Sequence, residues 1–346
     1  MRAVVFEAAG VVRVDHVPDP VVVEPTDAVV RVTRSAICGS DLHFFHLKAP
    51  VAPGDVLGHE AVGVVESVGR GVTTFAPGDR VVVAFDIACG TCWFCQRGQT
   101  QLCERSAVLG AGTFGGDLPG AQAERVRVPW ADTNLLAIPN AVDDDRALFV
   151  GDILTTAVYA ASLAAPGPDD VVAIVGMGPV GLLCVQTLRA IGARTVLALD
   201  REHARLAMAQ EAGAVTIDVG RRNPQSAVDE RTEGRGADVV IDAVGHPEAY
   251  GSAVSIVRRG GRVVVVGMYT GETVDLQLGV YWARALDVRF AGICPVHAWW
   301  RRAMDLVADG SIDPTPLISH RLSLDEAPSG YALFDRREAT KVVLTP

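Results

Sequence analysis

A glycine-rich turn between a strand and a helix is the feature that most constrains the fold of this chain. Residues 176–181 carry the pattern G-x-G-x-x-G. The apolar run 171–176 has the composition of a buried strand, and a helical pattern opens at Pro179. An acidic residue, Asp200, follows about twenty residues later at the end of a second apolar run. Because these parts occur together, the turn predicts a dinucleotide site in a doubly wound parallel sheet.

Each residue of the turn has a physical role in that prediction. Gly176 permits the tight turn, Gly178 lets the backbone approach a pyrophosphate, and Gly181 lets the helix pack closely on the strand. The N-terminus of the helix, at Pro179 and Val180, supplies free N–H groups and partial positive charge for the phosphates. A turn that only connects strand to helix is the alternative, and its context makes that the weaker interpretation.

The acid at the end of the second strand favours NAD over NADP. The Asp200 carboxylate can accept hydrogen bonds from both ribose hydroxyls, and its charge would repel a 2′-phosphate. Arg201 directly follows and offers a cation to such a phosphate, although we interpret it as a solvated surface charge. Further candidates for cofactor contact are Arg205 and the residues that end the later strands, namely Val244, Val266, Gly267 and Met268.

The length of 346 residues indicates two domains. The first part is rich in valine, and strand patterns occur at 11–14, 28–32, 61–68 and 80–84. Beyond residue 170, strands alternate with helices, with strands expected at 171–176, 195–200, 238–242 and 262–267 and helices at 179–191 and 202–212. The pattern loosens after residue 292 and ends in a strand-like run at 341–344. We assign 1–153 and 293–346 to a mostly β domain and 154–292 to an α/β, Rossmann-type domain.

Charge and hydropathy exclude some classes of partner. The net charge of −10 disfavours nucleic acid, whose phosphates need clustered lysine and arginine. No uninterrupted apolar run approaches the length of a bilayer span, so no membrane partner is expected. The first residues show no signal peptide, because Glu7 interrupts the apolar run, and a cytoplasmic location is therefore the expectation.

Four of the seven cysteines lie close together, with the spacing C-x2-C-x2-C-x7-C. Four thiolates satisfy tetrahedral zinc completely and leave no open position, which predicts a structural zinc site. Free or disulfide-bonded cysteines are one alternative, and an iron–sulfur cluster is another. The proposed ligands of the structural zinc are Cys89, Cys92, Cys95 and Cys103.

A second metal site is predicted around Cys38 and His59-Glu60. A thiolate, an imidazole and one carboxylate form a three-ligand zinc site whose fourth position is open to water or substrate. Taken singly, His59 could be a satisfied buried histidine and Cys38 a small buried hydrophobe. Their occurrence together with a dinucleotide motif favours a catalytic site.

These motifs resemble those of the zinc-containing medium-chain alcohol dehydrogenases. The zinc signature of that family matches Gly58-His59-Glu60-x2-Gly63-x5-Gly69-x2-Val72. The resemblance runs nearly end to end and implies a GroES-like catalytic domain with a structural zinc lobe beside the Rossmann domain. Stretches between residues 116 and 156 are also similar to the glutathione-independent formaldehyde dehydrogenase branch, whose longer insertions this chain lacks.

The resemblance supplies the third ligand of the open site. It aligns Asp152 with the position of a cysteine or aspartate ligand in the family, while an N-cap for the following helix is the alternative role. Glu60 lies beside the metal in the family and is proposed to enter its coordination shell transiently. The resemblance also implies that Thr156 lies close to the nicotinamide. Lys341 stands where the family often has a basic residue, so it contacts the pyrophosphate or is a surface lysine.

The expected reaction is hydride transfer between a primary or secondary alcohol and NAD, which gives an aldehyde or ketone. Zinc would bind the alcohol oxygen and lower its pKa, because an alkoxide is a far better hydride donor than an alcohol. By resemblance, Ser40 takes the proton, which passes through the nicotinamide ribose to His43 and solvent. His43 has a suitable unperturbed pKa for the outer end of such a relay.

Alternative functions remain open at this point. A polyol or threonine-type dehydrogenase on the same scaffold is the nearest, and a non-catalytic nucleotide- or zinc-binding protein is the other. The presence of Cys38 and His59 argues against the second. The strand pattern at 288–293 could pair two Rossmann sheets, and the resemblance implies a homo-oligomer, a tetramer or a dimer.

Overall fold

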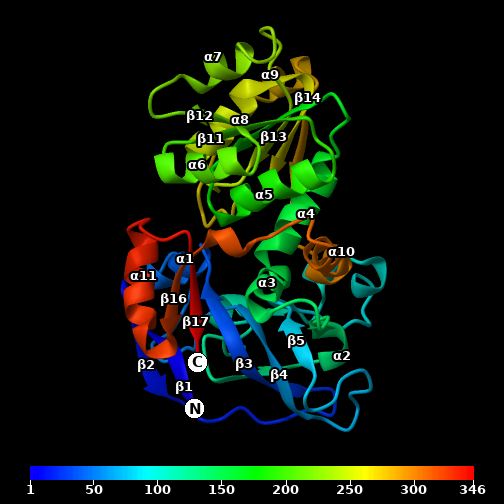
Figure 1. Ribbon diagram of the computed structural model, residues 1–346, viewed down its shortest axis with the longest axis vertical. Coiled ribbons are helices and arrows are strands. Elements are labelled where there is room, and N and C mark those ends of the chain that lie inside the picture. The colour runs from blue at the N-terminus through cyan, green and yellow to red at the C-terminus, as the bar shows by residue number, and fades with distance from the viewer. The chain divides into compact units, whose positions relative to one another are not determined.

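The structure, a computed structural model, describes the backbone of residues 1–346 and all side chains except that of Phe114. The chain divides into two compact units, and the ribbon in Figure 1 is coloured by residue number from blue at the N-terminus to red at the C-terminus. Unit 1 comprises Met1–Thr155 and Pro295–Pro346, and unit 2 comprises Thr156–Cys294.

Unit 2 contains one six-stranded parallel sheet. The strand order is β12-β11-β10-β13-β14-β15, so the first strand along the chain lies in the middle and the sheet grows outward in both directions. This order confirms the predicted doubly wound sheet. The strands are β10 (Val171–Val175), β11 (Thr195–Asp200), β12 (Val215–Asp218), β13 (Ala237–Asp242), β14 (Val257–Val265) and β15 (Asp287–Phe290). The helices are α4 (Ile153–Ala164), which starts in unit 1, α5 (Pro179–Ala190), α6 (His203–Glu211), α7 (Pro224–Asp229), α8 (Pro247–Ile256) and α9 (Leu278–Ala283).

The hydrophobicity of the central strands explains their position. Every residue of β10 is buried, and so is every residue of β13, as expected for parallel strands covered on both faces. β14 begins at Val257, ahead of the predicted 262–267, because its register with β13 shifts between Ala237 and Val239 and lets an irregular first segment pair. A sequence pattern cannot show such a shift.

Unit 1 is built mainly on a seven-stranded sheet with the order β16-β17-β3-β4-β5-β9, and β8 also pairs with β3. Two-stranded sheets, β1-β2 and β6-β7, complete it. The strands are β1 (Arg2–Ala8), β2 (Val11–His16), β3 (Ala28–Ile37), β4 (Glu60–Val68), β5 (Arg80–Val83), β6 (Asp86–Ile87), β7 (Ala107–Val108), β8 (Arg125–Val128), β9 (Leu135–Ala137), β16 (Ile318–Ser323) and β17 (Lys341–Thr345). The helices are α1 (Asp41–Phe45), α2 (Ala131–Asn134), α3 (Asp144–Leu148), α10 (Val296–Ala308) and α11 (Ala327–Asp335).

Strand β3 organises unit 1 because it has partners on both sides. It pairs antiparallel with β4 and β8, and its C-terminal part pairs with β17 from the far end of the chain. These partners extend β3 to Ile37, past the predicted end at Val32. The extension matters for the site, since the chain leaves the sheet directly at Cys38.

No single helix in the described part of the chain is long and apolar enough to cross a membrane. One bent pair of helices, Asp144–Gly151 with Ile153–Ala164, passes the same criteria of length and composition.

Candidate metal and cofactor sites

Three segments of unit 1 bring Cys38, His59 and Asp152 together. Cys38 follows β3 and His59 precedes β4, and because Ala36 pairs with Glu60 across these antiparallel strands, the two metal-ligand candidates lie side by side. Asp152 lies in the turn immediately before α4. All three side chains are buried.

The donor atoms of these residues converge on one point. Asp152 Oδ2 lies 3.7 Å from Cys38 Sγ and 3.5 Å from His59 Nε2. One donor atom from each of the three residues lies within 4.8 Å of the others. A sulfur, a nitrogen and a carboxylate oxygen suit zinc, and three protein donors leave a fourth position for a small molecule. The donor set therefore fits a catalytic rather than a closed zinc site.

The electrostatics of the cluster also favour a cation. Burial raises the pKa of the Cys38 thiol, and the neighbouring carboxylates of Glu60 and Asp152 raise it further. Burial alone would lower the pKa of His59, but the carboxylates of Asp41 and Asp152 outweigh it and raise that pKa. A divalent ion would relieve the repulsion among these groups and favour the thiolate.

Glu60 and Lys341 form a buried ion pair beside the three donors. Each side chain is only 1% exposed, and the Lys341 ammonium contacts Glu60 Oε2. Glu60 Oε1 has no hydrogen-bond partner among the described residues. The surface-lysine alternative for Lys341 is wrong, because its Nζ is buried against a carboxylate. Its contact with a pyrophosphate stays a prediction.

Residues 40–43 place polar groups around His59. The Ser40 hydroxyl lies 3.1 Å from His59 Nε2, and Asp41 Oδ1 lies 3.2 Å from His59 Nδ1. Asp41 Oδ2 accepts a hydrogen bond of 2.9 Å from the Cys38 N–H. His43 is half-buried on α1, and its backbone N–H donates to the Ser40 carbonyl. Sequence reasoning missed Asp41, although an acid between Ser40 and His43 was a visible signal.

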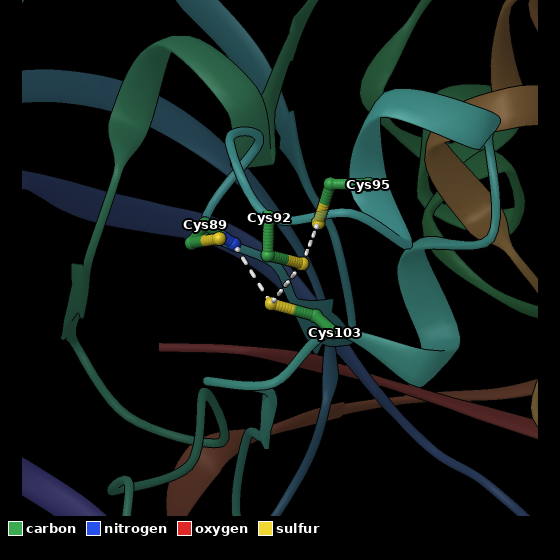
Figure 2. Close-up of side chains that lie close together, drawn as sticks. All are labelled: Cys89, Cys92, Cys95 and Cys103. Carbon is green, nitrogen blue, oxygen red and sulfur yellow. Dashed lines mark hydrogen bonds between the residues drawn. The ribbon is translucent and has the colours of Figure 1, made fainter.

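The second predicted metal site lies in the lobe around residues 89–103. Figure 2 shows the side chains of Cys89, Cys92, Cys95 and Cys103 gathered around a common centre. Cys92 Sγ lies 3.5 Å from Cys95 Sγ and 3.9 Å from Cys103 Sγ, so these sulfurs are too far apart for disulfides. None of the seven cysteines, all of which the structure describes, forms a disulfide.

Backbone and hydroxyl donors lie close to the sulfurs of the lobe and lower the pKa values of Cys89 and Cys92, whereas burial raises the pKa values of Cys95 and Cys103. The N–H groups of Cys89 and Arg105 each donate to Cys103 Sγ over 3.3 Å. Burial would raise the pKa of Cys89, but the Thr91 hydroxyl and nearby backbone N–H groups outweigh it and lower that pKa to about 6. One donor sulfur from each cysteine lies within 4.8 Å of the others, which fits a four-thiolate metal site.

The glycine-rich turn of unit 2 has the geometry that its sequence predicts. Gly176 has a φ of +93°, a conformation that side chains rarely adopt. A Cβ at Gly181 would lie 1.9 Å from the Gly176 carbonyl oxygen, whereas a Cβ at Gly178 would meet nothing within 4 Å. Pro179 begins α5 directly after this turn, and Val180 follows it. Close packing therefore requires Gly181, and Gly178 leaves its side of the turn open.

Asp200 ties the end of β11 to this turn. Its Oδ2 accepts a hydrogen bond of 2.6 Å from the Met177 N–H. Its Oδ1 accepts hydrogen bonds of 2.7 Å and 2.9 Å from the N–H groups of Arg201 and Glu202. The side chain of Arg201 is exposed, and that of Arg205 is half-buried.

The other cofactor candidates of unit 2 lie at the ends of β13 and β14. The Val244 N–H donates to Asp242 Oδ1, and the N–H groups of Val266 and Gly267 donate to the Asp242 carbonyl oxygen. These bonds bring Val244 and the segment 266–268, which includes Met268, to the same edge of the sheet as the glycine-rich turn. Thr156 opens unit 2 within α4. Asp242, buried at this edge, was not identified from the sequence.

Comparison with known families covers most of the chain. Residues 24–140 match the alcohol dehydrogenase GroES-like domain, and residues 179–309 match the zinc-binding dehydrogenase family. The chain is 36% identical over 380 aligned residues to an uncharacterized zinc-type alcohol dehydrogenase-like protein of Bacillus subtilis, with both chains covered completely. It is 32% identical to the glutathione-independent formaldehyde dehydrogenase of Pseudomonas aeruginosa, with 100% of this chain and 97% of the relative covered.

Solved structures of dehydrogenases also match this chain over its whole length. The alcohol dehydrogenase TADH from Thermus sp. ATN1 superposes with a TM-score of 0.96 and 45% identity, and the alignment covers 100% of this chain and 99% of that one. A putative zinc-binding dehydrogenase from Sinorhizobium meliloti bound to NADP superposes with a TM-score of 0.88 and 34% identity, with 100% and 99% covered.

Proposed function

Since the chain belongs to the zinc-containing alcohol dehydrogenase family, we propose that Cys38, His59 and Asp152 hold the zinc of its hydride-transfer site. The enzyme is a zinc- and nicotinamide-dependent oxidoreductase that acts on alcohols. The observation that carries the proposal is the convergence of three buried donors of different chemistry within 4.8 Å. Zinc at this position supplies a Lewis acid that makes an alcohol hydroxyl more acidic.

In this proposal, residues around the metal donors transfer the hydroxyl proton of the alcohol to solvent. Ser40 Oγ lies 3.1 Å from His59 Nε2, close enough to the donors to accept the hydroxyl proton of a bound alcohol. His43, three residues further on and half-buried, passes that proton to solvent. Glu60 places a second carboxylate beside the site, and Lys341 holds it there.

Substitution of the donors tests this assignment. Cys38→Ser and His59→Ala should abolish turnover, because each removes one of three metal donors, while NADH binding measured by fluorescence stays close to wild type. Leu276→Ala, an exposed position in unit 2, is the matched control and should keep full turnover. Near-normal turnover in either donor variant would refute the assignment.

NAD is the proposed coenzyme. The Asp200 carboxylate at the end of β11 supports this, since its negative charge disfavours a 2′-phosphate. Three backbone N–H groups already hold that carboxylate in place, so its position is fixed before a nucleotide binds. The ratio of kcat/KM for NAD and NADP decides the matter. A ratio that favours NADP would overturn the role of Asp200 and would point to Arg201 or Arg205 instead.

A second, structural zinc at the four cysteines of the lobe completes the proposed metal content of two ions per chain. In this proposal unit 1 is the catalytic domain, and unit 2 binds the nucleotide through the glycine-rich turn and the segment 266–268. Elemental analysis of the purified chain should return two zinc ions, and one ion would refute one of the two sites.

A homo-oligomer is also proposed. β15 is an edge strand of the six-stranded sheet, so its outer backbone groups are free to pair with a second copy. Phe290 at the end of this strand and Trp282 of α9 are 68% and 86% exposed, and large apolar side chains exposed at a sheet edge favour a partner that covers them. Light scattering should give the mass of a dimer or tetramer, and Phe290→Lys should shift it toward the monomer.

The class of alcohol is the remaining choice. A primary or secondary alcohol is the first proposal, and a polyol or threonine-type substrate is the alternative. A panel of primary alcohols, secondary alcohols, diols and polyols, followed by NADH absorbance, separates these classes by kcat/KM.

A further inference from the structure

A chain of buried polar side chains extends from the metal donors to the C-terminal helix of unit 1. It begins at Asp41, which contacts His59 Nδ1 and the Cys38 N–H, and continues through Gln122 to Tyr331 on α11. Asp41, Gln122 and Tyr331 are all 0% exposed. Buried polar groups of this kind are expensive unless every one has a partner, so their arrangement is tightly specified.

Gln122 is the centre of this chain. Its Nε2 donates one hydrogen bond of 3.1 Å to the Ala36 carbonyl oxygen and another of 3.1 Å to Asp41 Oδ2. Its Oε1 accepts a hydrogen bond of 2.9 Å from the Tyr331 hydroxyl. The side-chain amide therefore uses both donors on acceptors that lie next to the metal-donor segment.

Tyr331 determines which way the Gln122 amide points. If the amide were flipped, its oxygen would face two acceptors, the Ala36 carbonyl and the Asp41 carboxylate. The Tyr331 hydroxyl donates only to the oxygen of the observed orientation, so it stabilises that orientation. Without the hydroxyl, Oε1 would be a buried acceptor with no donor, and the amide would lose its preference.

Asp41 connects the Gln122 amide to two of the metal donors, His59 and Cys38. One of its oxygens faces His59 Nδ1, so it favours the tautomer whose proton is on Nδ1 and whose Nε2 is free to bind a metal. Its other oxygen accepts from both Gln122 and the Cys38 N–H. A shift of the Gln122 amide therefore reaches two of the three donors through one carboxylate.

The glycine of the zinc signature makes room for this arrangement. A Cβ at Gly58 would lie 2.2 Å from Gln122 Cγ, and the φ of Gly58 is +91°. Helix α11 is also joined to α1 independently, because His46 Nε2 lies 2.7 Å from Asp335 Oδ1 and the rings of Phe45 and Tyr331 are 5.4 Å apart. α11 therefore contacts the segment that carries Asp41 at more than one point.

We infer that Gln122 and Tyr331 are positioning residues of the metal site, which hold Asp41 and through it His59 and Cys38 in the geometry that binds the metal. This inference rests on the proposed function, since it assumes a metal at Cys38, His59 and Asp152. Helix α11 therefore helps to retain the metal, although it lies far along the sequence from Cys38, His59 and Asp152.

The test is the rate at which the zinc-loaded enzyme releases metal to a chromogenic chelator. Tyr331→Phe removes only the hydroxyl and keeps the ring against Phe45, and we expect one of the two metals to leave roughly tenfold faster. The matched control is Phe6→Leu, which weakens the same hydrophobic core without touching the polar chain. It should lower the Tm while both metals leave at the wild-type rate.

Gln122→Glu supplies a second, stronger variant. It replaces the donating amide with a carboxylate that faces Asp41, and we expect metal release about tenfold to a hundredfold faster than wild type. Cobalt substituted for zinc gives an independent readout, because its visible absorption reports the geometry of the donors. Tyr331→Phe should change that spectrum, and Phe6→Leu should leave it unchanged.

Two results would overturn the inference alone, and a third would overturn it together with the proposed function. If wild type holds two metals and Tyr331→Phe releases both at the wild-type rate, the polar chain has no role in metal retention, although the proposed function stands. If Phe6→Leu accelerates release as much as Tyr331→Phe does, the effect is general destabilisation. A wild-type chain with metal only at the four cysteines would instead refute the proposed function and the inference together.

Discussion

Removal of the Lys341 ammonium should destabilise unit 1 strongly. Glu60 and Lys341 are each 1% exposed, and Lys341 is the cation that pairs with Glu60 among the described residues. In Lys341→Met the Glu60 carboxylate would stay buried near Asp152 and Cys38, which are themselves anionic groups in their metal-binding forms. Loss of one partner of a buried ion pair costs about 3–5 kcal/mol, a large share of the usual stability of a domain.

A double-mutant cycle separates the charge effect from packing. Met is similar in length to both side chains, so Glu60→Met/Lys341→Met removes the two charges together and leaves most of the volume filled. Because replacing a whole buried pair is often close to neutral, the double variant should recover most of the stability that Lys341→Met loses. The coupling energy should reach at least about 2 kcal/mol.

Urea denaturation followed by tryptophan fluorescence measures these differences at constant zinc and constant pH. Four of the five tryptophans, Trp93, Trp130, Trp299 and Trp300, lie in unit 1, so the signal reports mainly on the unit that carries the substitution. With a slope of about 3 kcal/mol/M, the loss corresponds to a midpoint lower by roughly 1–2 M. A midpoint of Lys341→Met at the wild-type value, or a double variant less stable than Lys341→Met, would refute the reasoning.

Three further predictions concern other parts of the molecule. Burial raises the pKa of Asp86 to about 8, so the folded state binds its proton more tightly than the unfolded chain, and stability should fall as the pH rises from about 4 to about 8. Relative to Asp86→Asn, wild type should lose about 1.4 kcal/mol per pH unit in that window by urea denaturation, and parallel pH profiles would contradict this. Gly181→Ala should weaken NADH binding at least about tenfold in a fluorescence titration. The added Cβ would lie 1.9 Å from the Gly176 carbonyl oxygen and must push α5 away from the turn. Unchanged affinity for NADH would show that the turn adapts to the side chain. Cys103→Ser should remove one zinc per chain by elemental analysis and lower the Tm, while turnover of the surviving folded enzyme persists; retention of two zinc ions would refute the four-thiolate site.

The local patterns in the sequence predicted the sheet of unit 2 well. Continuous apolar runs and a glycine-rich turn are properties of neighbouring residues, and β10, β11 and α5 all occur where these patterns place them. The end of β3 was not predictable in the same way. Its last residues are held by β17, which lies some three hundred residues away, so the extension depends on a partner that no local pattern reveals.

In the candidate metal site too, local spacing identified some residues, and other residues depend on contacts between distant segments. Cys38 and His59 stand in recognisable spacings, and Asp152 came only from the family resemblance. Glu60 and Lys341 were named from the same resemblance, but Asp41, Gln122 and Tyr331 did not stand out, because their roles arise from contacts between distant segments. Gln122 meets Asp41 and Tyr331 only in the folded chain, and the ion pair of Lys341 with Glu60, which the sequence did not predict, likewise forms only there.

Because unit 1 is formed by two separate segments of the chain, it is complete later during synthesis than unit 2. Unit 2 is one continuous segment, so all six strands of its sheet exist once residue 294 has been translated. Unit 1 must wait for residues 295–346, since Tyr331 and Lys341 belong to that last segment. Until then the nascent chain carries Glu60 without its counter-charge and Gln122 without its hydroxyl donor. The metal of the Cys38, His59 and Asp152 site should therefore bind only after β17 has been translated, and a ribosome-bound chain that stops before β17 should hold zinc at the four cysteines alone.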